Sequence, residues 1–277
     1  MSSENEKEKE EVCFSGLETL TQDVLPQRVK ISGLCKIPQS LECNGLKISG
    51  SVDARDNILV NGDFTNSGLF RGYGNLLVKD NAKCSGSLTI EGEMKVGKDF
   101  QSSGHVACHG NLEVLGDFKS SGAFTVYKNL TIQGLLESSG MFTIDGDLQA
   151  YDIIIRSWKG INIGPLSFGN SRVNGNLTAM NSVELKNIQI KGNLYADRVI
   201  IGKNCQVNGT IYVVNEFSVL DKRAPPYQVI NITKQELLSH LNQQGYDVPN
   251  YCNQCGQKLS PEAKFCPGCG LSMKRDE

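Results

Sequence analysis

The chain has 277 residues, of which 39% are hydrophobic and 21% are charged, and its formal net charge at pH 7 is −2. A charge this close to zero provides no overall field to draw the chain to nucleic acid or to an anionic membrane. No apolar run approaches the ~20 residues that a membrane-spanning helix needs. The length suits one large domain with a small appendage.

The first 28 residues lack the regular pattern that follows them. The first eleven are mostly Glu, Lys and Ser and contain no apolar core of a secretory signal. We expect residues 1–28 to form a disordered tail, with residues 12–28 as a possible cap on the next domain. We also expect a cytoplasmic location and no direct binding to a membrane.

From Leu46 to Ile154 an apolar residue stands at every sixth position, in nineteen consecutive places. A six-residue step fits neither an α-helix, with its period of 3.6, nor a long strand, with its period of 2. It indicates short strands joined by turns. Gly, Asn or Asp stands two residues before most of these anchors, and these residue types tolerate positive φ. We therefore expect left-handed backbone conformations at the corners.

A second period of 18 residues groups the hexads in threes. It is clearest in the tripeptide Ser-Ser-Gly, which recurs at 102–104, 120–122 and 138–140. Three short strands per repeat, stacked coil on coil, predict an all-β, three-sided parallel β-helix. The pattern spans residues 29–219, or roughly ten coils and a rod about 50 Å long at ~4.8 Å per coil.

The register slips once, between Arg156 and Arg172, where Trp158 and Pro165 lie. The hexads then resume with a slightly shorter coil. This break predicts a loop insertion or, alternatively, a lateral binding surface. Residues 220–249 follow the β-helix as a linker with Pro225-Pro226. The sequence Thr233-Lys-Gln-Glu236 is typical of a capping box, so we expect a short amphipathic helix over about 233–244.

The C-terminal segment 250–277 contains two C-x-x-C pairs separated by ten residues, formed by Cys252, Cys255, Cys266 and Cys269. Four thiolates can close a tetrahedron around Zn²⁺ and leave no position open for substrate, so we predict one structural zinc. The segment resembles a short zinc ribbon. A redox dithiol pair is the alternative. Zinc ribbons bind proteins or nucleic acids. The positive bias of this segment is mild and is partly offset by Glu262, Asp276 and Glu277, so we favour a protein partner.

Six further cysteines are scattered along the chain. Cys84, Cys108 and Cys205 fall at inward positions, where a reduced cysteine acts as a small apolar residue. Reduced cysteines together with a zinc motif favour a reducing compartment, in agreement with a cytoplasmic location.

A finite β-helix exposes strand edges and an apolar cross-section at each end. These ends must be capped, by residues 12–28 and 220–245, or buried against another chain. The second possibility predicts a homopolymer that grows end to end. Its candidate interface residues lie in the first and last coils: Val29, Ile31, Ile211, Val213, Phe217 and Val219.

The hexads with Gly, Asn and Asp corners, framed by nonrepetitive tails, resemble the bactofilins, a family of polymer-forming cytoskeletal proteins, over residues 29–219. The resemblance implies a right-handed β-helix that assembles without nucleotide into nonpolar filaments and acts as a scaffold for protein partners. The chain departs from the family in its longer body, in the slip at 156–172 and in a tail without an apolar membrane-targeting stretch.

Two other classes of function remain as alternatives. A monomeric adaptor would use the β-helix as a spacer and the zinc ribbon as its working end. A hexapeptide-type acyltransferase would need a catalytic histidine, for which His105 and His109 are candidates. Both stand near a corner with no projecting loop, so we predict no catalytic residue, no enzyme activity and no small-molecule substrate.

Two further features of the sequence bear on ligand binding. The column Asp63, Asn81, Asp99 and Asp117 could hold a cation or a substrate, or could simply be screened by water. No G-x-x-x-x-G-K-[ST] motif occurs in the sequence, so we predict no nucleotide.

Overall fold

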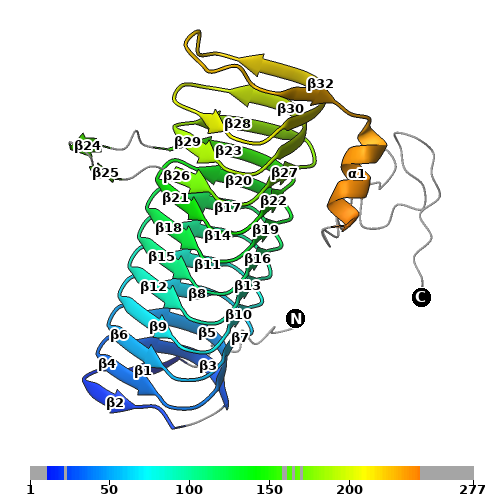
Figure 1. Cartoon of the computed structure of the whole chain (residues 1–277). Helices are drawn as coiled ribbons and strands as arrows, with labels where there is room; N and C mark the ends of the chain where they lie inside the picture. The colour runs from blue at the N-terminus through cyan, green and yellow to red at the C-terminus, as the bar shows by residue number, and fades with distance from the viewer. Residues whose placement is uncertain (1–10, 22–23, 158–160, 164–165, 169–170, 244–277) are drawn as a thin grey trace, which may run out of the picture.

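The computed structural model in Figure 1 describes residues 11–21, 24–157, 161–163, 166–168 and 171–243. The chain winds into a parallel β-solenoid of about 11 turns with ~18 residues per turn, followed by one short helix. Each strand pairs in parallel with the strand one coil away, as Leu76–Val78 does with Met94–Val96. The prediction of an all-β, three-sided parallel β-helix is confirmed.

Each coil contributes to three faces. The first face contains β7 (Ile58–Val60), β10 (Leu76–Val78), β13 (Met94–Val96), β16 (Leu112–Val114), β19 (Leu130–Ile132), β22 (Leu148–Ala150), β27 (Leu177–Ala179) and β33 (Val229–Asn231). The second face contains β1 (Glu11–Phe14), β8 (Phe64–Asn66), β11 (Ala82–Cys84), β14 (Phe100–Ser102), β17 (Phe118–Ser120), β20 (Leu135–Ser138), β23 (Asp152–Arg156) and β28 (Ser182–Lys186).

The third face is a separate sheet of β2 (Leu17–Thr19), β4 (Leu34–Ile37), β6 (Ser51–Ala54), β9 (Leu69–Gly72), β12 (Ser87–Ile90), β15 (His105–Cys108), β18 (Ala123–Val126), β21 (Met141–Ile144), β26 (Ser171–Val173), β29 (Ile188–Ile190) and β31 (Gln206–Val207). Four long strands turn the corner between the first two faces and pair on both, namely β3 (Val24–Ile31), β5 (Leu41–Ile48), β30 (Leu194–Ile201) and β32 (Ile211–Val219).

The solenoid extends beyond the predicted range 29–219 at both ends. At the N-terminus β1 pairs in parallel with β3, so residues from Glu11 onward already form a coil rather than a tail. At the other end β33 pairs with β32 and adds a strand to the first face. The terminal coils escaped prediction because Gly, Asn and Asp do not mark their corners at six-residue intervals.

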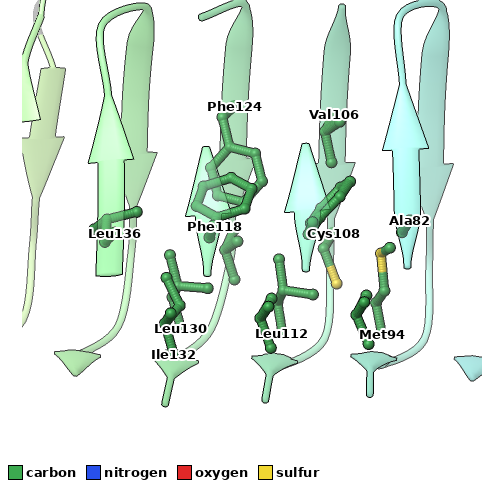
Figure 2. Packing of buried hydrophobic residues seen from close by; sticks show 14 of the residues in the cluster. Ala82, Met94, Val106, Cys108, Leu112, Phe118, Phe124, Leu130, Ile132 and Leu136 are labelled. Atoms are coloured by element: carbon green, nitrogen blue, oxygen red, sulfur yellow. The ribbon is translucent and has the colours of Figure 1, made fainter. Parts of the chain in front are cut away.

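In the stacked strands of the solenoid, alternate residues point into one continuous core. Figure 2 shows how these side chains stack from coil to coil, with Phe118 beside Phe124 and Leu112 in line with Leu130. The rings of Phe118 and Phe124 lie 4.6 Å apart and those of Phe124 and Phe142 lie 5.6 Å apart. All three rings are fully buried, so a ladder of aromatic contacts stabilises the middle of the rod.

The six-residue register ends one anchor earlier than predicted. Leu136 pairs with Ile153, not with Ile154, so this coil has 17 residues. Ile153 and Ile155 are buried, and Ile154 lies on the outer face. The run Ile153-Ile154-Ile155 hides this shift in the sequence, because every position in it is apolar.

An inserted hairpin explains the slip between Arg156 and Arg172. Its strands β24 (Ile161–Ile163) and β25 (Leu166–Phe168) form the one antiparallel pair among the described strands. The hairpin projects from the flank of the rod in Figure 1. On either side of it the coils still stack, since Leu148 pairs with Leu177. The predicted insertion is therefore present; Trp158 and Pro165 lie outside the described residues.

The corner glycines allow close contact between coils, and the prediction that they adopt positive φ is wrong. Among the described residues, only Gly16, Asn187 and Asn204 have φ in the left-handed region. At Gly104 a Cβ atom would overlap the carbonyl oxygen of Gly86, one coil away, and Gly86 stands in the same relation to Gly68. Glycine is needed there because the corners touch.

Asparagine and aspartate corners form hydrogen-bond ladders along the rod. The Asn75 backbone N–H donates to Asn57 Oδ1 at 2.8 Å, and the Glu93 N–H donates to Asn75 Oδ1 at 2.8 Å. The same contact recurs further along, where the Asp147 N–H donates to Asn129 Oδ1 at 2.9 Å. Each side-chain oxygen thus satisfies a backbone donor that the turn leaves without a strand partner.

The helix α1 (Lys234–Gln243) lies on the flank of the rod and not across its end. Thr233 caps it as predicted, because the Glu236 N–H donates to Thr233 Oγ1 at 3.2 Å and the Thr233 N–H donates to Glu236 Oε2 at 2.7 Å. The buried face of the helix packs on outer side chains of the last coils, through Leu237, Leu238 and Leu241 against Met180, Tyr151, Tyr195, Val214 and Ile232.

The substitution Gly104→Ala tests whether coil contact sets the corner residue. We expect it to lower the free energy of unfolding by about 3 kcal/mol, because the added methyl group meets backbone that cannot move independently. Gly45→Ala is the matched control: its Cβ would meet the flexible Arg28 side chain at 3.3 Å, so we expect little change. Thermal unfolding followed by circular dichroism compares the two. Equal midpoints would contradict the steric explanation.

Candidate functional site

The two ends of the rod are the first candidate site. We call the free strands β1, β2 and residues 24–25 the N-terminal rim, since each pairs on one side only among the described residues. Val29 and Ile31, predicted to form this edge, are buried and lie one coil inward, paired with Val12 and Phe14. The edge therefore falls at β1.

The C-terminal rim consists of residues 216–219 of β32 together with β31 and β33. Ile211 and Val213 are buried beneath β33, so of the predicted residues only Phe217 and Val219 belong to a free edge. Tyr227 packs against the core here: its ring lies 6.3 Å from that of Phe217, and its hydroxyl donates to the Cys205 carbonyl oxygen at 3.0 Å. This contact covers part of the rim.

The two candidate histidines lie on the outer surface. His105 is exposed at the start of β15. His109 stacks on Tyr127 at 4.3 Å and lies 3.6 Å from a carboxylate oxygen of Glu91. Neither lines the groove of about 520 Å³ that runs along the second face between Lys83, Ser103 and Lys119. Both histidines thus lie outside this groove.

The carboxylates of the acidic column accept hydrogen bonds from backbone N–H groups of the next coil. Asp63 Oδ1 accepts the Asn81 N–H at 3.2 Å, and Asp99 Oδ1 accepts the Asp117 N–H at 2.9 Å. Asp117 Oδ1 in turn accepts the Leu135 N–H at 2.9 Å. Each carboxylate is thus engaged in the corner ladder, which accounts for the column without a bound cation.

Five of the six scattered cysteines are buried, and Cys13 is exposed on β1. Burial raises the pKa of the thiols of Cys43, Cys84 and Cys108 to about 11. Such thiols stay protonated at neutral pH and are poor nucleophiles. They serve as small core residues, as predicted for the inward positions of Cys84 and Cys108.

Helix α1 fixes where the chain leaves the rod. Lys234 Nζ donates to the Met180 carbonyl oxygen at 2.7 Å and lies 3.4 Å from Asp197 Oδ1. His240 stacks on Tyr195 at 3.8 Å, and burial lowers the pKa of its imidazole. The described chain ends at Gln243, on the flank of the rod.

The predicted zinc ligands Cys252, Cys255, Cys266 and Cys269 lie outside the described residues. Their donor chemistry suits Zn²⁺, since four thiolates in two C-x-x-C pairs provide a complete tetrahedral set. In the part of the chain that the structure describes, no group of three or more His, Cys, Asp or Glu side chains could hold a metal.

Comparison with known proteins gives one finding. Residues 251–273 match the family model of the zinc-ribbon domain. No curated protein and no solved structure matches the chain. The match supports zinc binding by the C-terminal segment, whereas the β-solenoid rests on the structure itself. None of the described helices has the length and hydrophobicity to span a membrane.

Metal analysis tests the zinc site. We expect one zinc per chain in protein purified under reducing conditions, and we expect Cys255→Ser with Cys269→Ser to remove it, because two thiolates cannot complete the tetrahedron. Cys13→Ser is the control and should retain the metal. The β-rich circular dichroism of the rod should survive metal loss in every variant. A protein with no zinc, or full occupancy in the double variant, would refute the site.

Proposed function

We propose that this protein is a cytoplasmic, non-enzymatic scaffold that assembles end to end through the rims of its β-helix. One observation carries the proposal: the apolar core continues into both terminal coils, where strand edges remain without a partner among the described residues. Phe14 at one rim and Phe217 and Val229 at the other pack against the core while still partly exposed. Stacking on a further coil would bury them and pair their backbone.

The resemblance to bactofilins supports the same proposal. The shared features are a long stack of short parallel strands and the lack of a nucleotide-binding motif, so assembly would need no nucleotide. From the same resemblance we also propose that the coil is right-handed and that the filaments are nonpolar.

The zinc ribbon supplies a second function in this proposal, the recruitment of protein partners. Helix α1, which precedes the ribbon in the chain, packs on the flank and leaves Phe217 and Val219 at the rim uncovered by the helix itself. A partner of protein class is favoured over nucleic acid because the chain carries a net charge of −2. We propose a structural role for the zinc, which holds the ribbon folded.

A monomeric adaptor is the second candidate function. It is favoured by Tyr227, which covers part of the C-terminal rim through its contacts with Phe217 and Cys205. If such contacts seal the rim, the rod is a spacer and the zinc ribbon is the working end.

Phe217→Arg tests assembly at the C-terminal rim. We expect it to abolish filaments, because a guanidinium group in the last coil could not be buried against another chain without a partner. The β-rich circular dichroism should persist. Tyr127→Arg, on an exposed flank residue, is the matched control and should leave filaments intact. Negative-stain micrographs decide the outcome. Only dispersed monomers of the wild type at every salt and protein concentration would refute the proposal.

Deletion of residues 246–277 separates the scaffold from the adaptor. We expect the truncated protein to polymerise as the full chain does, because the rims and α1 remain, and to lose the capture of protein partners. Sedimentation measures the first property and affinity capture with the full chain as reference measures the second. Loss of polymer together with the ribbon would favour an assembly role for that segment instead.

A further inference from the structure

One charged side chain occupies an inward position of the β-helix. Glu18 in β2 pairs with Cys35, which pairs with Val52, which pairs with Phe70. The last three side chains are buried in the core. Strand alternation therefore places Glu18 at the head of an apolar column, in the terminal coil of the N-terminal rim.

No other charged residue stands in such a column among the described strands. The inward positions elsewhere hold aliphatic, aromatic, small or uncharged polar residues, and the buried polar side chains are confined to Ser, Thr, Asn and Gln. Glu18 thus breaks a rule that the rest of the rod obeys, and it does so in the outermost coil. Inward charges on edge strands are one way in which proteins prevent unwanted sheet pairing.

The carboxylate of Glu18 is half-buried and has no cationic partner among the described residues. Glu18 Oε1 accepts the Ser15 N–H at 3.3 Å. The nearby Lys30 pairs with Glu11 at 3.6 Å instead. Burial, with a smaller contribution from the negative charge of Glu18, raises the pKa of the Cys35 thiol beneath it.

The C-terminal rim has the opposite character. Its inward positions hold Phe217, Val219, Val207 and Val229, and its one polar inward residue, Asn231, is uncharged and exposed. Val219 is 37% exposed, and the neighbouring Leu220 is 66% exposed. This rim could be buried without removing any inward charge from water.

We propose that the C-terminal rim is the primary assembly surface, that it binds the C-terminal rim of a second copy, and that Glu18 raises the protein concentration at which the N-terminal rim stacks. The inference rests on the proposed function. Two identical C-terminal rims meet with two-fold symmetry, apolar against apolar, and form a closed pair.

Growth beyond the pair must bury Glu18 whichever rim approaches. Against a C-terminal rim stacked in register, the carboxylate would lie unpaired at the end of its own column, next to the buried side chains of Cys205 and Ile188. Against another N-terminal rim two copies of Glu18 would repel each other. An unpaired buried charge is costly, so the carboxylate sets the protein concentration at which filaments appear.

The test compares full-length, zinc-loaded variants by sedimentation velocity and negative-stain microscopy over a concentration series. The Glu18→Val variant places in this column the residue type that Val52 already provides. We expect its filaments to appear at about one-tenth of the wild-type onset concentration, or below that. Glu18→Gln should act in the same direction more weakly. Glu11→Val is the matched control: it removes the same charge from an outward position of the same coil and should leave the onset within about twofold.

The wild type should pass through particles of two chains, twice 30.2 kDa, before filaments form, and Phe217→Arg should remove these particles. An unchanged onset in folded Glu18→Val and Glu18→Gln, or an equal change in Glu11→Val, overturns the inference while leaving end-to-end assembly intact. If the wild type and all variants remain single chains at every concentration, both the inference and the proposed function fail. Circular dichroism confirms the fold of each variant.

Discussion

The rod depends on the close approach of successive coils at their corners. Parallel strands about 4.8 Å apart fix the spacing along each face, and the corner must follow at the same spacing. A Cβ at Gly104 or Gly122 would overlap the carbonyl oxygen of the coil beside it. Glycine at these corners is thus a packing requirement, and from it come the straight columns, the continuous core and the two open rims.

The sequence predicts this fold well where the spacing is constant. Between Leu46 and Leu148 the same residue types return to the same corner, so strand, turn and inward face can all be read from position. Prediction fails at the first coil that loses a residue, where Leu136 pairs with Ile153; the shorter coils after Arg172 were expected. In the 17-residue coils near the C-terminus, Asn187 and Asn204 adopt left-handed φ values of 56° and 54°. A left-handed residue lets the chain turn the corner with one residue fewer. Such local changes shift the register without changing composition.

The candidate sites were harder to predict, because a solenoid brings the same residue type to the same place in successive coils. The resulting column looks like a cluster of functional residues even when its role is structural. Asp63, Asp99 and Asp117 form an acidic column, yet each accepts a backbone N–H from the next coil. The corner asparagines do the same. What the sequence did not reveal was Glu18, because the N-terminal coil has no clear hexad and only the pairing of β2 with β4 assigns this residue to the inward face.

Where no other element covers its ends, a β-helix limits its growth with the residues of its last coils. Here the two rims differ: an inward carboxylate lies at one, and aromatic and aliphatic side chains lie at the other. Helix α1 adds to this difference, because it packs beside Tyr195 on the flank and leaves Phe217 and Val219 at the edge. A helix laid over the rim would have buried the same leucines on apolar side chains. Its position on the flank instead leaves Phe217 and Val219 at the edge of the described rod, which is what the proposed assembly requires.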